Sequence, residues 1–359
     1  MAEVVVNVLH HEYTIFIENG LLARLSEYVR PYTGKRAVIV TDDRVAPYYL
    51  SRVKEQMEKG GVACGEVVIP HGEGSKSSAM LQRLYDAFFE YQLTRSDVIV
   101  ALGGGVIGDL TGYAAATFLR GLPFLQIPTT LLAQVDSSVG GKVAINVAQG
   151  KNLIGTFYQP DRVLADLDVL KTLDHRQKMA GLAEVFKYGC IADANLLQTL
   201  REHADHLEDV LGNVVADCCR IKAHYVENDP YDKGIRMELN FGHTLGHAVE
   251  KICGYGAYLH GEAVAIGMPA AAYWGELLGI TPKGLAEEIR QREQELGMPT
   301  RLPDISLDEA MRVMAGDKKS AGDDIHIVLL KERGKAVAHR IHKAELKNVL
   351  EEAWPWMQA

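Results

Sequence analysis

Short apolar runs alternate with amphipathic stretches through the first half of the chain. The runs are rich in β-branched residues and bounded by turn residues, which is typical of strands buried on both faces of a parallel sheet. They cover residues 4–8, 13–17, 36–41, 66–69, 97–102, 124–127 and 163–165. Residues 45–59 and 77–91, which lie between these runs, have the period of amphipathic helices. This alternation predicts a doubly wound, Rossmann-like α/β domain over residues 1–173, in which the first two strands form a hairpin.

The second half of the chain is dominated by helical periodicity. The helical pattern covers residues 174–203, 207–228, 240–253, 259–278 and 282–295. A later β pattern joins residues 325–330 to 336–341 and predicts one small hairpin. We therefore expect a mainly α-helical C-terminal domain over residues 174–359. Because the sequence contains no repeat and no obvious linker, the two domains are expected to pack closely, with a cleft between them.

The balance of charge limits the partners that the chain can bind. Its 359 residues include 38 Lys and Arg against 47 Asp and Glu, which gives a formal net charge of −9. Nucleic acid and anionic membranes require a basic surface, so neither partner is expected. The longest stretch without a charged residue, 121–135, is shorter than the roughly 20 apolar residues of a membrane span, and no signal-peptide pattern precedes it. Five cysteines without CxxC spacing favour neither disulfides nor a thiolate zinc site, and we expect a cytoplasmic protein.

Glycines follow the strand predicted at 97–102. Gly103, Gly105 and Gly108 match the GxGxxG pattern, in which glycine lets the backbone turn sharply and approach a pyrophosphate at a helix N-terminus. The pattern alone is weak, and no acidic residue lies about 20 positions further on, so a tight strand-to-helix turn is the alternative. Upstream carboxylates at a strand end (residue 42) and a loop (residue 73) can bind ribose hydroxyls or belong to solvated turns.

Histidines cluster in the second half of the chain. His243 and His247 are one helical turn apart, and His260 begins the next predicted helix. Upstream, Glu184 and Lys187 lie three residues apart on another helix. Two imidazoles and one carboxylate with an open fourth position make up a catalytic zinc site, but spacing alone does not say which two histidines bind. The alternative is a set of hydrogen-bonded structural histidines.

Six cations lie between the glycine motif and the histidines, and several of them have apolar or glycine-rich surroundings: Arg120, Lys142, Lys151, Lys187, Lys222 and Arg236. In an acidic chain, cations gathered at one cleft would attract an anionic small molecule. Lysines on a solvated surface are the commoner explanation for any one of them.

Together these residues make the chain resemble the 3-dehydroquinate synthases, a family of sugar-phosphate cyclases of the shikimate pathway. The resemblance covers nearly the whole chain. Its strongest parts are GGGVIGDLTG (103–112), RGLPFLQIPTTLLAQVDSSVGGKVAIN (120–146), GKNLIGTFYQP (150–160), LAEVFKYG (182–189), LNFGHTLGHAVE (239–250) and LHGEAVAIGM (259–268). Many ordered matches are far more specific than any single motif.

The resemblance implies an NAD-binding α/β domain and a helical metal-binding domain. It implies that Glu184, His243 and His260 hold a divalent metal, zinc or cobalt, and that His247 faces the substrate. NAD contacts carry over to Asp42, Glu73, Lys76, Gly105, Val106, Ile107, Gly108, Asp109, Thr129, Thr130, Lys142, Lys151 and Thr172. Substrate contacts carry over to Asp136, Lys142, Asn152, Lys187, Lys222, Arg236, Asn240 and His247. Arg120 would reach the site of a neighbouring subunit, which implies a homodimer.

The reaction that the resemblance implies converts 3-deoxy-D-arabino-heptulosonate 7-phosphate to 3-dehydroquinate and phosphate. It proceeds by transient oxidation by NAD, phosphate elimination, re-reduction, ring opening and aldol closure, which makes the enzyme a carbon–oxygen lyase. Other cyclases, such as 2-deoxy-scyllo-inosose or valiolone-type synthases, which act on substrates without a carboxylate, are rivals, but Arg236, Asn240 and the SSVGGK string each favour a dehydroquinate synthase. A metal-dependent alcohol or glycerol dehydrogenase and an inactive regulatory protein are the remaining alternatives.

Overall fold

The computed structural model describes residues 1–204, 206–254, 256–315 and 323–359. It divides into two compact units. Unit 1 comprises Met1–Asp174 and Leu211–Tyr231, and unit 2 comprises His175–Val210 and Asp232–Ala359. Helix α7 (Leu211–Asn228) packs against strands β1 and β2 in unit 1, although the predicted division at residue 173 assigned this segment to the C-terminal domain.

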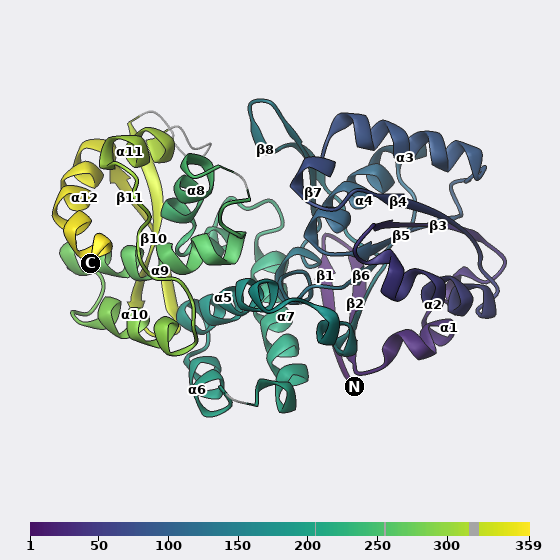
Figure 1. The fold of residues 1–359 in the computed structure, drawn as a ribbon, viewed down its shortest axis with the longest axis horizontal. Coiled ribbons are helices and arrows are strands. Elements are labelled where there is room, and N and C mark those ends of the chain that lie inside the picture. The colour runs from purple at the N-terminus through teal and green to yellow at the C-terminus, as the bar shows by residue number, and fades with distance from the viewer. Residues whose placement is uncertain (205, 255, 316–322) are drawn as a thin grey trace. The chain divides into compact units, whose positions relative to one another are not determined.

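A seven-stranded sheet forms the centre of unit 1 (Figure 1). Its order is β1-β2-β9-β6-β5-β3-β4, with bounds Ala2–Val8 (β1), His11–Glu18 (β2), Arg36–Asp42 (β3), Ala63–Ile69 (β4), Val98–Gly103 (β5), Phe124–Pro128 (β6) and Arg162–Asp166 (β9). The strands from β2 to β4 pair in parallel, and β1 closes the edge as an antiparallel hairpin with β2. All seven strands expected from the apolar runs are confirmed, each within a few residues.

The central strands are buried because both of their faces are covered. β5 and β6 are buried at every residue, which explains why they appear in the sequence as continuous apolar runs instead of alternating ones. Helices α2 (Ala46–Lys59), α3 (Ser78–Glu90) and α4 (Gly105–Thr117) connect the strands, and α3 and α4 contribute Leu84, Phe88 and Leu110 to the core. The α/β fold expected for this half of the chain is confirmed.

The order of the strands reverses beside β3. The chain passes from β3 outward to β4 and then returns to β5 on the other side of β3. In a doubly wound sheet, ligands bind outside the carboxyl ends of the strands where such a reversal occurs. The glycines after β5 and Asp42 at the end of β3 flank this point. The reversal therefore explains why the glycine motif follows β5 and not the first strand.

A second hairpin in unit 1 was not expected from the sequence. β7 (Lys142–Val147) and β8 (Gly150–Phe157) pair antiparallel, whereas the sequence pattern predicts no strand between residues 127 and 163. β8 has no buried residue, so it lacks the alternation that identifies a half-buried strand. Its close pairing depends on Gly155, since a Cβ there would lie 2.3 Å from the carbonyl oxygen of Val143.

Unit 2 is mainly helical, as expected. Its helices are α5 (His175–Ile191), α6 (Ala194–Glu202), α8 (His243–Ile252), α9 (His260–Leu277), α10 (Leu285–Glu295), α11 (Leu307–Ala315) and α12 (Lys343–Gln358). β10 (Asp324–Glu332) and β11 (Lys335–His342) form the predicted hairpin. The helix expected at 174–203 is divided, because Asp193 caps α6 by accepting the N–H of Asn195. α11 and α12 were not expected.

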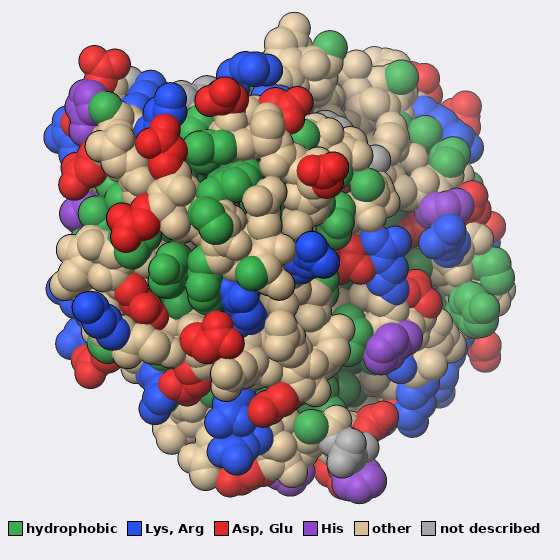
Figure 2. Space-filling view, turned by 60° about the vertical axis from the view of Figure 1, so that its left-hand side comes forward, with side chains coloured by type: hydrophobic (Ala, Val, Ile, Leu, Met, Phe, Trp, Pro, Cys, Tyr) green, Lys and Arg blue, Asp and Glu red, His purple; other side chains and the backbone are tan. Residues whose placement is uncertain are grey.

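The distribution of charge on the surface and the apolar content of the helices are relevant to nucleic-acid and membrane binding. Among the described residues on the face drawn in Figure 2, acidic and basic side chains are interspersed. In the described part of the chain, no helix combines the length and the apolar character needed to cross a membrane.

The carboxyl group of Glu293 on α10 is fully buried. Neither of its oxygens has a hydrogen-bond partner among the described residues, and burial raises its pKa well above the ordinary value, although Arg290 opposes this effect. The unfolded chain then binds fewer protons than the folded protein between the two pKa values, so stability falls as pH rises through that window.

We expect Glu293→Gln to remove this contribution, which amounts to at most about 1.4 kcal/mol per pH unit. Melting temperatures of both proteins at pH 5 and pH 8 check the prediction. The advantage of the variant over the wild type should be larger at pH 8, and an equal difference at both values would contradict it.

Candidate functional site

Three helices of unit 2 approach one another at glycines. A Cβ on Gly261, at the start of α9, would lie 1.9 Å from the carbonyl oxygen of Ala180 on α5. A Cβ on Gly246 of α8 would lie 2.9 Å from the carbonyl oxygen of Ala263 on α9. Any larger side chain would force the helices apart. This packing brings together the residues that α5, α8 and α9 carry at their point of contact.

Glu184, His243 and His260 meet at this point. Oε1 of Glu184 lies 3.8 Å from Nε2 of His243 and 3.7 Å from Nε2 of His260. The Glu184 side chain is 1% exposed, and its Oε1 has no hydrogen-bond partner among the described residues. A buried carboxylate oxygen without a partner is costly, and a cation between the three atoms would satisfy it. One carboxylate oxygen and two imidazole nitrogens suit Zn²⁺ or Co²⁺, so the residues present fit a divalent metal.

Groups next to Glu184 and His243 determine which atoms of these side chains are available to bind a metal. The ammonium of Lys187 donates a hydrogen bond to Oε2 of Glu184, which leaves Oε1 facing the imidazoles. Burial lowers the pKa of His243 well below its ordinary value, and the positive charge of Lys187 lowers it further. Nδ1 of His243 is 3.1 Å from the carbonyl oxygen of Phe241, which only accepts, so Nδ1 carries the proton. The lone pair of His243 is therefore on Nε2, where a metal would bind.

A pocket lies next to this cluster. It is lined by Met237, Asn240, His243, Thr244, His247, His326 and Val328. The structure thus brings Asn240 and His247 to the same place as the candidate metal ligand His243. His326 on β10 was not predicted, because a lone histidine in a strand far along the chain carries no pattern that links it to α8.

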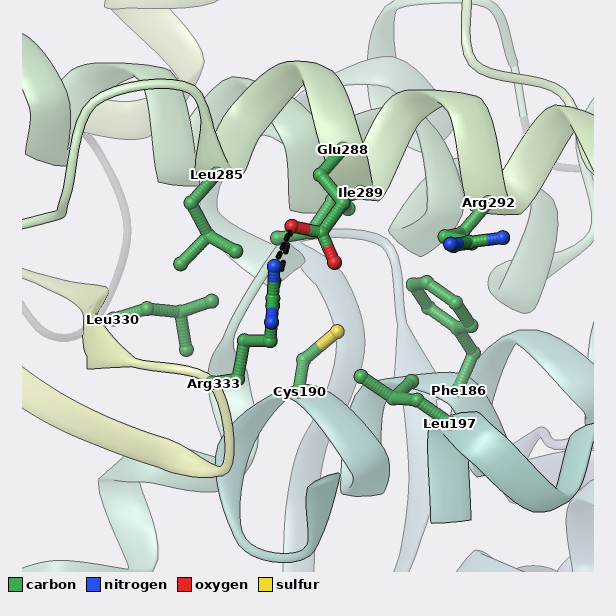
Figure 3. Close-up of a pocket in the computed structure, with 9 residues that line it drawn as sticks. All are labelled: Phe186, Cys190, Leu197, Leu285, Glu288, Ile289, Arg292, Leu330 and Arg333. Atoms are coloured by element: carbon green, nitrogen blue, oxygen red, sulfur yellow. Dashed lines mark hydrogen bonds and ion pairs between the residues drawn. The ribbon is translucent and has the colours of Figure 1, made fainter. Parts of the chain in front are cut away.

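Another pocket of unit 2 lies against a different face of α5 (Figure 3). Phe186 and Cys190 of α5 form part of its wall, and Arg333 makes an ion pair with Glu288 in it. None of the predicted site residues lines it. With most of its remaining wall apolar, it is a gap in the packing of α5 and α10 and holds none of the predicted chemistry.

In unit 1, the backbone after β5 is shaped to receive a ligand. Gly104 precedes α4 in an extended conformation, and no side chain caps the helix N-terminus. A Cβ on Gly104 or Gly105 would lie 3.0 Å from the side chain of Thr130 or Ser137, respectively, so a larger residue at either position would crowd these neighbours. Exposed N–H groups at a helix N-terminus bind phosphate.

Two buried hydroxyls lie at the carboxyl ends of β3 and β6, the two strands that flank β5 in the sheet. Oγ1 of Thr41, in β3, and Oγ1 of Thr129, directly after β6, are buried and have no hydrogen-bond partner among the described residues. Buried hydroxyls are normally bonded, so a polar ligand at the carboxyl edge of the sheet would supply the partners that these atoms lack. With the glycine turn, they fit a dinucleotide.

A polar network continues from this turn. The buried ammonium of Lys76 contacts Asp109 of α4 at 2.7 Å and donates to the side chain of Asn152. Asn146 donates to Glu73 at 2.7 Å and accepts the N–H of Asn152 at 2.9 Å. Burial raises the pKa of Asp109, whereas the charge of Lys76 opposes this. Asn146, which was not predicted, thereby connects three residues that were.

The remaining predicted site residues of unit 1 lie on different elements and have different hydrogen-bond partners. Lys222 of α7 contacts the Asp136 carboxylate at 2.7 Å, and Thr172 is bonded to the hydroxyl of Tyr49. Asp42 accepts the N–H groups of residues 44 and 45 and so also stabilises the turn after β3. Lys142 and Lys151 lie on the β7–β8 hairpin.

Arg120 lies on an exposed turn. Its φ is 71°, and that of the preceding Leu119 is 48°. Consecutive left-handed conformations of residues other than glycine are strained, and such strain is often retained at functional positions.

We expect Lys76→Met to weaken NAD binding about 10- to 100-fold, because Lys76 is one of the predicted NAD contacts. The variant should also have a lower melting temperature, because it leaves a partly buried Asp109 without its cation. Isothermal titration with NAD checks the affinity. Lys54→Met is the matched control, since Lys54 forms a more exposed ion pair with Glu66 in the same unit. Unchanged NAD affinity in Lys76→Met would contradict the assignment.

Solved structures share this fold. A 2-deoxy-scyllo-inosose synthase complexed with carbaglucose-6-phosphate, NAD⁺ and Co²⁺ matches with a TM-score of 0.86 and 24% identity over 98% of this chain and 100% of that one. A 2-epi-5-epi-valiolone synthase from Streptomyces hygroscopicus subsp. jinggangensis 5008, with NAD⁺ and Zn²⁺ bound, matches with a TM-score of 0.86 and 26% identity over 96% and 97% of the two chains. A glycerol dehydrogenase from Schizosaccharomyces pombe is more distant, with a TM-score of 0.68 and 18% identity over 96% and 89% of the two chains. The fold is thus that of the sugar-phosphate cyclases.

Sequence comparison identifies the family within this class. Residues 66–180 match the 3-dehydroquinate synthase N-terminal domain, and residues 181–320 match its C-terminal domain. The 3-dehydroquinate synthase of Clostridium botulinum is 45% identical over 94% of this chain and 97% of its own length. That of Neisseria gonorrhoeae is 43% identical over 96% and 98%. The chain belongs to the 3-dehydroquinate synthase family.

Proposed function

We propose that the chain converts 3-deoxy-D-arabino-heptulosonate 7-phosphate to 3-dehydroquinate and phosphate, with NAD and a divalent metal as cofactors. Among the features of the structure, the convergence of Oε1 of Glu184 with Nε2 of His243 and His260 carries this proposal, because it leaves a buried carboxylate oxygen that a cation bound between the three atoms would satisfy. When bound, NAD would accept a hydride and return it, and the metal would polarise a substrate oxygen. The net reaction then involves no redox change.

The residues of unit 2 would hold the metal and orient the substrate. Lys187 bonds Oε2 of the Glu184 carboxylate and leaves Oε1 toward the imidazoles, and the low pKa of His243 keeps its imidazole neutral and able to donate an electron pair. Arg236 is buried at 1% exposure, which suits a guanidinium that binds a carboxylate in a dry site. Asn240 would bind the substrate's hydroxyls.

The residues of unit 1 would hold NAD and part of the substrate. The pyrophosphate would bind the α4 N-terminus, and Asp42 and Glu73 would bind ribose hydroxyls. Lys142 and Asn152, together with His247 of unit 2, would bind the phosphate. By holding that phosphate, they would position its own oxygen to take the proton from the neighbouring carbon during elimination. Lys222, held by Asp136, would bind substrate oxygens.

We further propose that the protein is a cytoplasmic homodimer. The exposed, strained turn at Arg120 supports this, because an exposed guanidinium of unit 1 would be available to bind at the phosphate site of a second subunit. Sedimentation equilibrium should give twice the chain mass of 39.5 kDa.

The function is tested by supplying the purified chain with the heptulosonate phosphate, NAD and zinc. Phosphate and 3-dehydroquinate should form in equal amounts, and absorbance at 340 nm should not rise, since NADH does not accumulate. Steady NADH formation with glycerol and no release of phosphate would instead identify a dehydrogenase. Activity on glucose 6-phosphate in preference to the carboxylated substrate would identify another cyclase.

A further inference from the structure

One face of α8 carries a third group beside its two histidines. His243, His247 and Glu250 occupy positions i, i+4 and i+7, so their side chains lie along the same side of the helix. Glu250 is only 6% exposed. Its Oε2 lies 3.2 Å from Nδ1 of His260, at the start of α9. A buried carboxylate is therefore directed at one of the candidate metal ligands.

This contact determines where the proton of His260 lies. A carboxylate only accepts hydrogen bonds, so Nδ1 of His260 donates and its electron pair is on Nε2. Nε2 of His260 is the atom that lies 3.7 Å from Oε1 of Glu184. The carbonyl oxygen of Phe241 likewise accepts a hydrogen bond from Nδ1 of His243. Both rings therefore present an unprotonated Nε2 to the carboxylate of Glu184.

The groups that accept the hydrogen bonds of the two histidines differ in charge. Phe241 offers His243 a neutral carbonyl, whereas Glu250 offers His260 a carboxylate, which makes the stronger hydrogen bond. A ligating imidazole that donates to a carboxylate is held in one orientation and one tautomer, and it becomes a better electron-pair donor. His260 needs this support more than His243, because its side chain is 32% exposed against 12% for His243.

We propose that Glu250 is a positioning residue of the metal site, which fixes the ring of His260 and strengthens its Nε2 as a ligand. This inference rests on the proposed metal-dependent function. His247, Glu250 and His260 also have donor atoms within 4.8 Å of one another, so Glu250 could instead be a ligand. That arrangement would take the Glu250 carboxylate away from its hydrogen bond with Nδ1 of His260, and it would leave the buried Oε1 of Glu184 without a partner.

Two variants and one control test the proposal. Glu250→Ala removes the hydrogen bond, and Glu250→Gln keeps an acceptor of the same shape without the charge. Glu276→Gln is the control. Glu276 lies on the same helix as His260, about 24 Å further along it, and it also accepts a hydrogen bond, from the N–H of Ala286 on α10. Zinc affinity is measured by chelator competition, the visible spectrum is recorded after cobalt loading, and melting of the metal-free proteins reports folding.

We expect Glu250→Ala to weaken zinc binding about 10- to 100-fold, Glu250→Gln to weaken it less, and Glu276→Gln to leave it unchanged. The cobalt spectrum of Glu250→Gln should keep the intensity of a four-coordinate site. Unchanged zinc affinity in both Glu250 variants would overturn the proposal, whatever their melting temperatures. Loss of stoichiometric metal in both would also overturn it, because Glu250 would then be a ligand. A wild-type protein that binds no metal would instead contradict the proposed function itself.

Discussion

Glu184→Gln is expected to lose both metal binding and activity. Oε1 of Glu184 is the shared neighbour of both ligating imidazole nitrogens, and Lys187 occupies the other oxygen of the carboxylate. The amide has the same size but no negative charge, so the cation would lose its only anionic ligand in the predicted set. We expect turnover to fall by at least about 10³-fold, or about 4 kcal/mol in transition-state stabilisation. Metal content by mass spectrometry and the rate of phosphate release check this together.

Glu293→Gln is the matched control for this variant. Glu293 is another fully buried glutamate of unit 2, but it lies outside the candidate metal cluster. It should keep one metal per chain and the wild-type rate. Wild-type turnover of Glu184→Gln in metal-depleted buffer would show that the cluster has no part in the reaction.

Arg236→Met is expected to lower kcat/KM by about 10³-fold, with much of the loss in KM. The guanidinium is buried at 1% exposure, and a buried site built to bind a carboxylate binds poorly once its cation is removed. Arg236→Lys separates charge from shape, because an ammonium restores the charge without the two-pronged geometry. It should recover part of the loss.

Steady-state kinetics with the heptulosonate phosphate measure both variants. Metal content should remain at the wild-type level, since Arg236 is not among the candidate ligands. If KM and kcat/KM of Arg236→Met matched the wild type, the carboxylate would have to bind elsewhere. The distinction from cyclases with uncarboxylated substrates would then lose its basis in this residue.

The sheet of unit 1 could be predicted because burial on both faces imposes a local pattern. β5 and β6 are apolar at nearly every position, and that composition is visible without any knowledge of neighbours. β8 is the opposite case. It is held by pairing with β7 while its side chains stay exposed or half-buried, so no periodicity identifies it.

The site could be predicted only as far as each residue belonged to a motif. Spacing left open which two of three histidines face Glu184, because His243 and His247 are on one helix face and His260 is on another helix. The close packing of α5, α8 and α9 at Gly246 and Gly261 favours His243 and His260. Such a choice depends on tertiary structure.

The residues that sequence reasoning missed act through other residues. Asn146 connects Glu73 to Asn152, and Glu250 supports His260. Neither belongs to a local motif with its partner, since the contacts join different elements. His326 enters a pocket wall from β10 for the same reason.

The most direct measurement is an anomalous difference map from a crystal grown with zinc, recorded at the zinc absorption edge. We predict one peak in unit 2, about 2.0–2.2 Å from Oε1 of Glu184 and from Nε2 of His243 and His260. A peak bonded to His247 and Glu250, or no peak near Glu184, would contradict it.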